Sequence, residues 1–351
     1  MTESTLGRKI RLAVLVSTLP TGGAERVTFN LLTRLDPGRF DSEVYFLKEP
    51  GTIGMSLLEH GIRGYPRLQK LRYDPFLIFR LLRRVRAFSP DVFLILNCHR
   101  NAMFWGGLCS LLTDTGKRVI AVHHTGTNNS PKNFDGVDRL FLGSTASIVA
   151  LSNLHARYIE EVDGLDPAKI TIIENGIIID KYGRSDAQKL SELRAALEIT
   201  ENEKVVIMVA GLRPEKAHEA LIRAAHILQE RRTDVRFLIV GDGPRRQELE
   251  EMARASHVRE SVMFLGERDD VADLLHLAHV FVLPSHSVVE TLPLSVMEAM
   301  AAGVPVVASA VGSVPDMIED RVNGILIPPA DGERLAEALG DLLSDDAFAR
   351  L

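Results

Sequence analysis

The chain has little cysteine. Its 351 residues include only Cys98 and Cys109, with no CxxC pair and no Cys/His spacing typical of zinc. We therefore expect neither a disulfide framework nor a metal cluster, and a reducing cytoplasm fits. No apolar run reaches the length that spans a bilayer, and the run that ends before Ser17 is too short for a secretion signal. Any membrane contact is expected to be peripheral.

An excess of positive charge is also absent. The net charge of −6 argues against a general nucleic-acid binder, while 46% hydrophobic and 25% charged residues are typical of a globular protein. The length predicts two domains of ordinary size. No Asp-x-Asp metal motif stands in a plausible site, so we expect no metal and no other cofactor.

Apolar runs alternate with helical spacing along both halves. The run at 10–17 is typical of a parallel strand buried on both faces, and Ala24–Leu35 has apolar residues at helical spacing. This order predicts an α/β fold with parallel sheets covered on both faces. In the first half, further strands are predicted near 43–47, 91–96, 118–122 and 139–142, and helices near 53–60, 75–88, 101–112 and 152–161.

The same alternation restarts at Lys204. Strands are predicted at 205–211, 235–241, 261–266, 280–284, 304–309 and 324–329, with helices near 216–230, 245–255, 270–277 and 331–344. A polar stretch after Asn175-Gly176 separates the two series, so we predict domains 1–180 and 181–351. In such sheets, ligands bind beyond the carboxyl ends of the strands.

The stretch 284–303 contains a helix start and a helix stop. Pro293 suits the first helical position and Gly303 the position after the last, which predicts a short helix over Leu292–Ala302. The free amides and positive dipole end of such a helix attract a phosphate or diphosphate.

Two carboxylates flank this helix start. Glu290 precedes the helix and Glu298 lies inside it, about 8 Å further along the axis at about 1.5 Å per residue. That separation is too large for a shared proton and suits the two ends of an extended ligand. Hydroxyl-binding groups at both ends and an anion site between them match a nucleotide sugar.

Glu290, seven intervening residues and Glu298, followed by AMAAGVPVVA at 299–308, resemble the donor-site signature of retaining glycosyltransferases of the GT-B fold, family 4, or glycosyl transferases group 1. The resemblance implies two Rossmann-like, doubly wound domains facing a cleft, the first on the acceptor side and the second binding the donor. It implies transfer of a hexose-type unit from a nucleotide-diphosphate sugar to a glycan or lipid-linked acceptor, in cell-envelope polysaccharide synthesis.

Two cations follow the first strand of the second half. Pro214 can begin the next helix, so Arg213 and Lys216 are expected around its first turn. The resemblance implies that they hold the donor diphosphate; alone, they are equally typical of a solvated loop. Position 217 is Ala where the family often has Gly, so a slightly different loop is expected.

The resemblance implies further donor-binding residues, most of them in turns. These are Gly22, Gly23, Gly243, Glu267, Arg268, Thr291, Leu292, Leu294 and Glu298. Each turn taken alone could be ordinary turn chemistry, with glycine supplying an unusual backbone conformation.

Two histidines, His123 and His124, follow the predicted strand at 118–122. The resemblance implies that one histidine here contacts the transferred sugar; we assign His123 as catalytic, with Arg213, Lys216 and Glu290. His124, and His99 with Arg100 on the same expected edge, are assigned to the acceptor.

The stretch 67–88 mixes basic residues with Phe76, Leu77, Phe79 and Phe88. A basic amphipathic helix can lie on an anionic membrane, although a helix packed on the sheet with its arginines in water has the same pattern. We therefore expect a cytoplasmic protein that can contact the inner face of the membrane through residues 67–88. We expect no nucleic-acid partner.

Other functions remain open at this point. A nucleotide-sugar epimerase or a phosphorylase could use the same architecture, because fold does not fix function. A non-catalytic nucleotide-sugar-binding protein is the alternative outside enzymes. For a transferase that retains the anomeric configuration, we find no residue identified as a covalent nucleophile, so front-face displacement is expected.

Overall fold

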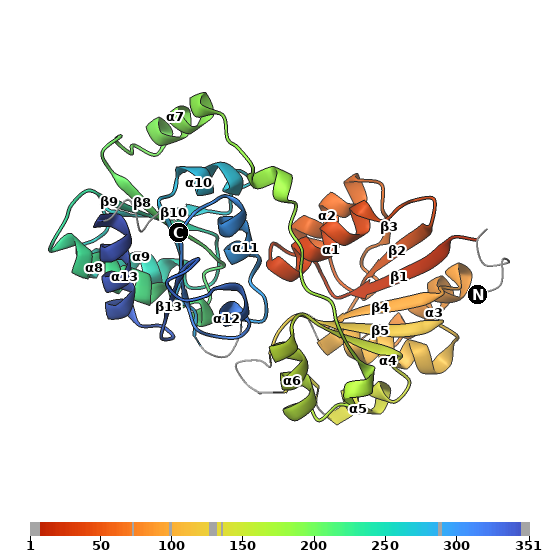
Figure 1. The fold of residues 1–351 in the computed structure, drawn as a ribbon. Helices are drawn as coiled ribbons and strands as arrows, with labels where there is room; N and C mark the ends of the chain where they lie inside the picture. The colour runs from red at the N-terminus through yellow and green to blue at the C-terminus, as the bar shows by residue number, and fades with distance from the viewer. Residues whose placement is uncertain are drawn as a thin grey trace. The chain divides into compact units, whose positions relative to one another are not determined.

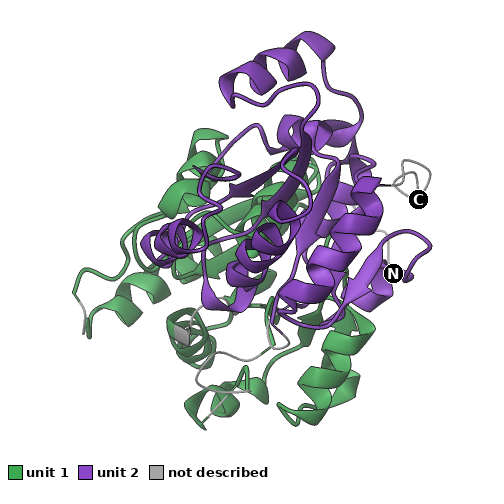
Figure 2. Ribbon diagram, turned by 90° about the vertical axis from the view of Figure 1, so that its left-hand side faces the viewer, with its two compact units in different colours: residues 1–175 green, residues 176–351 purple. Residues whose placement is uncertain are grey.

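The structure is a computed structural model that describes residues 8–71, 74–97, 100–125, 132–134, 136–286 and 290–344. It divides into two compact units, unit 1 (residues 1–175) and unit 2 (176–351), coloured separately in Figure 2. Within the described ranges, no helix is both long and apolar enough to cross a membrane.

Unit 1 has a seven-stranded sheet in the order β3-β2-β1-β4-β5-β6-β7. All of its described strand pairs are parallel. The strands are β1 (Ile10–Val16), β2 (Phe40–Phe46), β3 (Arg63–Tyr65), β4 (Val92–Asn97), β5 (Lys117–Val122), β6 (Ser147–Ala150) and β7 (Ile170–Ile172). The helices are α1 (Gly23–Arg34), α2 (Gly51–Glu59), α3 (Leu77–Phe88), α4 (Arg100–Leu112), α5 (Gly136–Leu142) and α6 (Asn153–Glu161), with a 3-10 turn η2 (Pro167–Lys169).

Helices cover both faces of this sheet. Successive side chains of β1 point to opposite faces, so that Val14 packs with residues of α1 and α2 while Leu15 packs with residues of α3 and α4. Figure 1 shows α1 and α2 together on one side of the sheet. Burial on both faces explains why β1 is a continuous apolar run.

Unit 2 has a six-stranded parallel sheet in the order β10-β9-β8-β11-β12-β13. Its strands are β8 (Lys204–Val209), β9 (Val235–Val240), β10 (Val262–Gly266), β11 (Val280–Leu283), β12 (Val306–Ser309) and β13 (Ile325–Ile327). Its helices are α7 (Ala187–Ala196), α8 (His218–Gln229), α9 (Arg246–Ala255), α10 (Val271–Leu277), α11 (Leu294–Ala301), α12 (Val314–Met317) and α13 (Gly332–Ser344), with 3-10 turns η3 (Ile179–Tyr182) and η4 (Pro214–Lys216).

These two parallel-sheet units confirm the predicted α/β fold class. The structure divides the chain between Asn175 and Gly176, the dipeptide from which the junction was predicted. The assignment of 1–180 to the acceptor side and 181–351 to the donor stays a prediction.

The strand predicted near 139–142 is wrong. Those residues belong to helix α5, and the strand that follows β5 in the sheet is β6, at Ser147–Ala150. In α5, Val137 and Leu140 are exposed while Phe141 is buried, which is one-sided helical burial. A short apolar run does not distinguish this from a buried strand.

Two other helices also differ from the prediction. The central helix α11 begins at Leu294, two residues later than predicted, because Pro293 has an extended backbone and is the residue before the first helical turn. Helix α7 was not predicted, because none of its residues is buried and its sequence shows no apolar stripe.

Candidate active site

The sheet of unit 2 reverses its strand order between β8 and β11. From β8 the chain adds β9 and β10 on one side, and from β11 it adds β12 and β13 on the other. Ligands of open α/β sheets bind outside the carboxyl ends of the strands at such a reversal. The loops after β8, β9, β11 and β12 are therefore the candidate donor site.

A partly buried ion pair joins the loops on the two sides of this reversal. The Lys216 Nζ, after β8, donates to the Oε1 of Glu290, after β11, at 2.5 Å. The Ser285 hydroxyl donates to the same carboxylate oxygen at 2.6 Å. Glu290 is only 4% exposed, so these two donors compensate a carboxylate that is largely removed from water. The predicted catalytic residues Lys216 and Glu290 thus meet.

Arg213 lies three residues before this ion pair, at the start of η4. Its side chain is exposed, and no described residue forms an ion pair with it. Ala217 ends η4 with φ 49° and ψ 46°, in the left-handed region. Alanine therefore occupies a left-handed position that glycine favours, at a cost in backbone strain, and the expected difference in loop shape stays a prediction.

The loop after β12 approaches the backbone of Glu290 closely. A Cβ at Gly312, where φ is 51°, would lie 1.4 Å from the Glu290 carbonyl oxygen. The Ser313 N–H donates to the Thr291 carbonyl at 3.2 Å, next to this contact. Only glycine allows this approach, so Gly312 fixes the backbone that presents Glu290.

Helix α11 starts four residues after Glu290, at Leu294. Its N-cap is Pro293, and no side chain caps it in the described part of the chain. Thr291, Leu292 and Leu294 are buried around this start, and Glu298 is half-buried in the fifth position of the helix. Thr291, Leu292 and Leu294 therefore surround a helix start that has no side-chain cap among the described residues, which favours an anion, and Glu298 lies one turn further along.

The turn after β9 joins the same group of loops. The Leu212 N–H donates to the Asp242 carbonyl at 3.0 Å, and a Cβ at Gly243 would lie 2.6 Å from the Leu212 carbonyl oxygen. The predicted donor residue Gly243 is thus packed against the loop that carries Arg213.

The segment after β10 shows a different arrangement. Glu267 is exposed, whereas the Arg268 guanidinium makes two hydrogen bonds to Asp270, at 2.8 and 2.5 Å. This guanidinium lowers the pKa of Asp270. The side chain of Arg268 is therefore already engaged within its own turn.

In unit 1, the predicted glycines begin helix α1. Gly22 is the N-cap with extended backbone, Gly23 is the first helical residue, and the Arg26 N–H donates to the Gly22 carbonyl at 3.0 Å. A Cβ at Gly22 would lie 2.3 Å from the Glu25 carboxylate. The absence of a side chain at Gly22 leaves room for that carboxylate.

The two histidines follow β5 in unit 1. Burial lowers the pKa of His123 to about 4, so its ring is neutral at pH 7. The His124 Nδ1 lies 2.8 Å from the Asn133 Oδ1, and since this oxygen only accepts, His124 donates.

A buried aspartate anchors this histidine. Asn133 donates to the Asp163 carboxylate with its side-chain amide, at 2.9 Å, and with its backbone N–H, at 2.7 Å. Burial raises the pKa of Asp163. His124 is thus fixed by a chain of hydrogen bonds that ends on Asp163.

Two predicted acceptor residues cannot be placed. His99 lies outside the described residues, and Arg100 is described only as the first backbone position of α4. Among the residues that the structure does describe, no group of three or more His, Cys, Asp or Glu side chains could hold a metal ion.

Sequence reasoning missed several residues of the site. Ser285, Gly312, Asn133 and Asp163 were not singled out, and neither was His218, a fully buried histidine at the start of α8. Ser285 lies inside the stretch 284–303 that contains Glu290 and Glu298, directly after the predicted strand at 280–284, and this position could have indicated it. The other four become recognisable only from contacts between segments distant in the sequence.

Both halves of the chain match models of glycosyltransferase families. Residues 21–181 match the model of "Glycosyltransferase Family 4", and residues 190–350 match "Glycosyl transferases group 1". The chain is 34% identical over 217 residues to the D-inositol 3-phosphate glycosyltransferase of Mycobacteroides abscessus, covering 60% of this chain and 45% of that one. It is 32% identical over 162 residues to the N-acetyl-alpha-D-glucosaminyl L-malate synthase of Bacillus anthracis, covering 46% and 42%.

These matches span less than half the length of those two relatives. Among solved structures, HepE of Anabaena in complex with UDP and glucose has a TM-score of 0.83 at 22% identity, covering 97% of this chain and 92% of that one. This likeness shows the fold, which is GT-B. By the two family matches, the first half of the chain belongs to the family 4 glycosyltransferases and the second half to the glycosyl transferases of group 1.

Proposed function

We propose that this protein is a retaining glycosyltransferase that moves a hexose-type unit from a nucleotide-diphosphate sugar to a glycan or lipid-linked acceptor in cell-envelope polysaccharide synthesis. The observation that carries the proposal is the Lys216–Glu290 ion pair at the strand-order reversal, beside exposed Arg213 and the uncapped start of α11. Cations and free amides suit a diphosphate, and a carboxylate suits sugar hydroxyls. The UDP and glucose bound by HepE support a nucleotide sugar as the donor.

The chemistry we propose is a front-face displacement. The bond between the anomeric carbon and the diphosphate oxygen breaks while the acceptor hydroxyl oxygen bonds to the same face, and the acceptor proton passes to the departing diphosphate. Arg213, Lys216 and the α11 amides stabilise the negative charge that develops on the diphosphate. Glu290 holds a hydroxyl of the sugar, so that the rate comes from positioning and charge stabilisation.

We propose that His123 acts in this scheme as an uncharged hydrogen-bonding group. A ring with a pKa of about 4 carries no charge at pH 7 and can exchange hydrogen bonds with hydroxyls of the transferred sugar. His124, held by Asn133, is assigned to the acceptor side. The remaining glycine and turn residues named above keep their proposed donor roles through the backbone.

The membrane contact that we propose uses α3 and the residues just before it. The buried stripe of α3, which includes Leu81 and Val85, packs on the sheet as expected for an ordinary helix. Leu71, Phe76 and Phe79 are nonetheless 68%, 64% and 66% exposed. Exposed aromatic and apolar side chains among basic ones suit an anionic membrane surface, so we propose a cytoplasmic enzyme at the inner face of a membrane.

The alternatives differ in what they consume. An epimerase would change the sugar nucleotide without an acceptor, a phosphorylase would require phosphate, and a non-catalytic binding protein would release no nucleotide. The Lys216–Glu290 pair joins a proposed phosphate-binding group and a proposed sugar-binding group, which supports a site for an intact sugar nucleotide.

A panel of nucleotide sugars tests the proposal. One donor should raise the melting temperature above the others, because a ligand that binds only the folded state stabilises it. With that donor and a saccharide acceptor, NMR of the product should show the anomeric configuration of the donor, and EDTA should leave the rate unchanged. An inverted product would exclude the retaining mechanism, and a lack of stabilisation by every donor would exclude the function.

A further inference from the structure

Unit 1 carries a pocket of about 510 Å³ that the donor chemistry does not use. It is lined by Lys48, Glu49, Arg67, Gln69 and Lys70. Among these described lining residues, three cationic side chains and one carboxylate give a net charge of two positive charges. The volume is within the range of small-molecule sites.

The backbone holds the two halves of this pocket together. The Arg67 N–H donates to the Lys48 carbonyl at 3.1 Å, and the Gln69 N–H donates to the Leu47 carbonyl at 2.7 Å, so residues 67–69 run alongside the end of β2. Arg67 has φ 55°, a left-handed conformation that is strained for arginine. Strain of this kind persists where the surrounding structure imposes it, and it is concentrated at functional sites.

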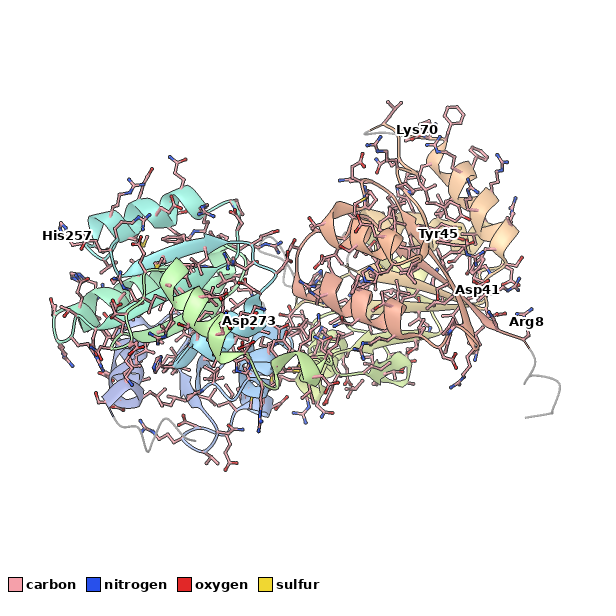
Figure 3. All side chains as sticks on the ribbon, turned by 90° about the horizontal axis from the view of Figure 1, so that it is seen from above. Arg8, Asp41, Tyr45, Lys70, His257 and Asp273 are labelled. Atoms are coloured by element: carbon pink, nitrogen blue, oxygen red, sulfur yellow. The ribbon has the colours of Figure 1, made fainter. Side chains whose placement is uncertain are left out.

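Buried groups fix the other residues of the pocket. The Lys70 N–H donates at 2.7 Å to the buried carboxylate of Asp74, and this bond, with the guanidinium of Arg80, lowers the pKa of Asp74. The Gln69 side-chain oxygen accepts from Asn101, in the first turn of α4, at 3.2 Å. Figure 3 shows Lys70 on the loop that leads into α3.

The pocket lies at the carboxyl edge of the unit 1 sheet. Glu49 precedes Pro50, whose carbonyl accepts from the Leu19 N–H at 2.7 Å, in the loop between β1 and Gly22. Asn101 follows β4 in the same way. The pocket is therefore beside the loops that the proposed acceptor side would use.

We propose that this pocket binds a phosphate or diphosphate group of the acceptor. Two net positive charges match a phosphate dianion or a diphosphate better than a single carboxylate, and arginine and lysine are the side chains that proteins use for phosphate. Arg67 pairs with Glu49, but both side chains are mostly exposed, so the pair is weak and Arg67 can turn to a ligand. Naming this group as part of the acceptor rests on the proposed function.

Binding of inorganic pyrophosphate tests the pocket apart from the donor site. The measurement is calorimetry on the full chain carrying R213Q and K216Q, which removes the donor cations. In this background, adding K48Q, R67Q and K70Q should weaken pyrophosphate binding more than about 10-fold, because three charge-assisted contacts are lost. The matched control, K9Q with R34Q and R157Q, removes the same charge from exposed positions of unit 1 and should change little. Equal weakening in both would overturn the proposal.

A second variant is expected to tighten pyrophosphate binding, a result that misfolding cannot produce. In the same R213Q/K216Q background, Glu49→Gln removes the carboxylate among the described lining residues and should tighten pyrophosphate binding about threefold, the size of an exposed ion pair. An unchanged or weaker affinity contradicts the pocket. These experiments need no transfer activity, so a chain that binds pyrophosphate here but turns over no donor would refute the proposed function and leave the pocket standing.

Two further probes distinguish the source of the phosphate. If the acceptor is lipid-linked, the chain should sediment with phosphatidylcholine vesicles that contain a polyprenyl phosphate, and the K48Q/R67Q/K70Q variant should not. If it is a free saccharide phosphate, glucose 6-phosphate should compete with pyrophosphate and the vesicles should capture nothing. Failure of both probes to depend on the three cations counts against the proposal.

Discussion

Unit 1 and unit 2 are built alike, but the carboxyl edges of their sheets treat charge differently. In unit 2, Lys216 meets a buried carboxylate, and four loops are joined by short contacts around it. In unit 1, Lys48 and Lys70 are exposed around an open pocket. The charged groups of the unit 2 edge are therefore held by contacts with one another, whereas the lysines of the unit 1 edge are open to solvent.

The largest expected effect breaks the partly buried pair of unit 2. Lys216→Ala should lower transfer by about 10²–10³-fold, because it removes a cation aimed at the leaving group and leaves Glu290 without that partner. The measurement is donor turnover. Arg236→Ala is the matched control, since Arg236 pairs with the largely buried Glu203 in the same unit, where β8 and β9 begin. Equal losses in the two variants would show that Lys216 acts only through stability.

The second effect concerns the backbone that presents Glu290. Gly312→Ala should destabilise unit 2 by about 3 kcal/mol or more, because the new Cβ meets the Glu290 carbonyl and the backbone is left-handed. Gly303→Ala has positive φ but nothing within 4 Å, so it should cost only about 1 kcal/mol. Chemical denaturation measures both, and similar values would mean that the loop after β12 simply moves away.

The third effect is a pH dependence in unit 2. Burial lowers the pKa of His218 from 6.5 to about 4, and neither ring nitrogen meets a hydrogen-bond partner of good geometry among the described residues. Between pH 6.5 and 4 the unfolded chain binds a proton that the folded chain does not, so stability falls as pH falls through this window. The loss approaches about 3 kcal/mol at pH 4.

His218→Leu should remove this contribution and flatten the dependence of unfolding free energy on pH. His226→Leu, at an exposed position of the same helix, should leave the slope as it is. Denaturation curves between pH 4 and 7 provide the test. A slope that His218→Leu does not change would show that the ring does not stay neutral in the fold.

The smallest expected effect is a change in stability from a substitution in the loop after β8. Ala217→Gly should stabilise the chain by about 1 kcal/mol, because glycine adopts the left-handed conformation without strain. Thermal unfolding measures it. A loss of stability would mean that the packing of the buried Ala217 methyl group outweighs the backbone term.

Much of the fold follows from the sequence, because strands buried on both faces leave continuous apolar runs such as β1 and β8. The exceptions have physical causes. Helix α5 is a short apolar run with one buried side, and α7 buries no residue, so neither carries a clear period. The predicted start of α11 was early because proline is common both at the first helical position and just before it.

The site was predictable only in part. A motif identified Glu290 and Lys216, but their contact joins residues 74 positions apart and depends on β8 lying beside β11. The two hydrogen bonds from Asn133 to Asp163 correspond to no sequence pattern. The pocket of Lys48 and Arg67 depends on a strained backbone, which no composition or period reveals.

Under the proposed function, the Lys216–Glu290 pair competes with the donor, because each side chain is already bound to the other. Each side chain already satisfies the other, so an incoming molecule must replace both partners before it gains anything. A nucleotide that offers only phosphates would take Lys216 away from Glu290 and give the carboxylate no new partner. A free sugar would take Glu290 and give the Lys216 ammonium no new partner. The site therefore discriminates against fragments, and an intact sugar nucleotide should bind more tightly than its separate pieces suggest.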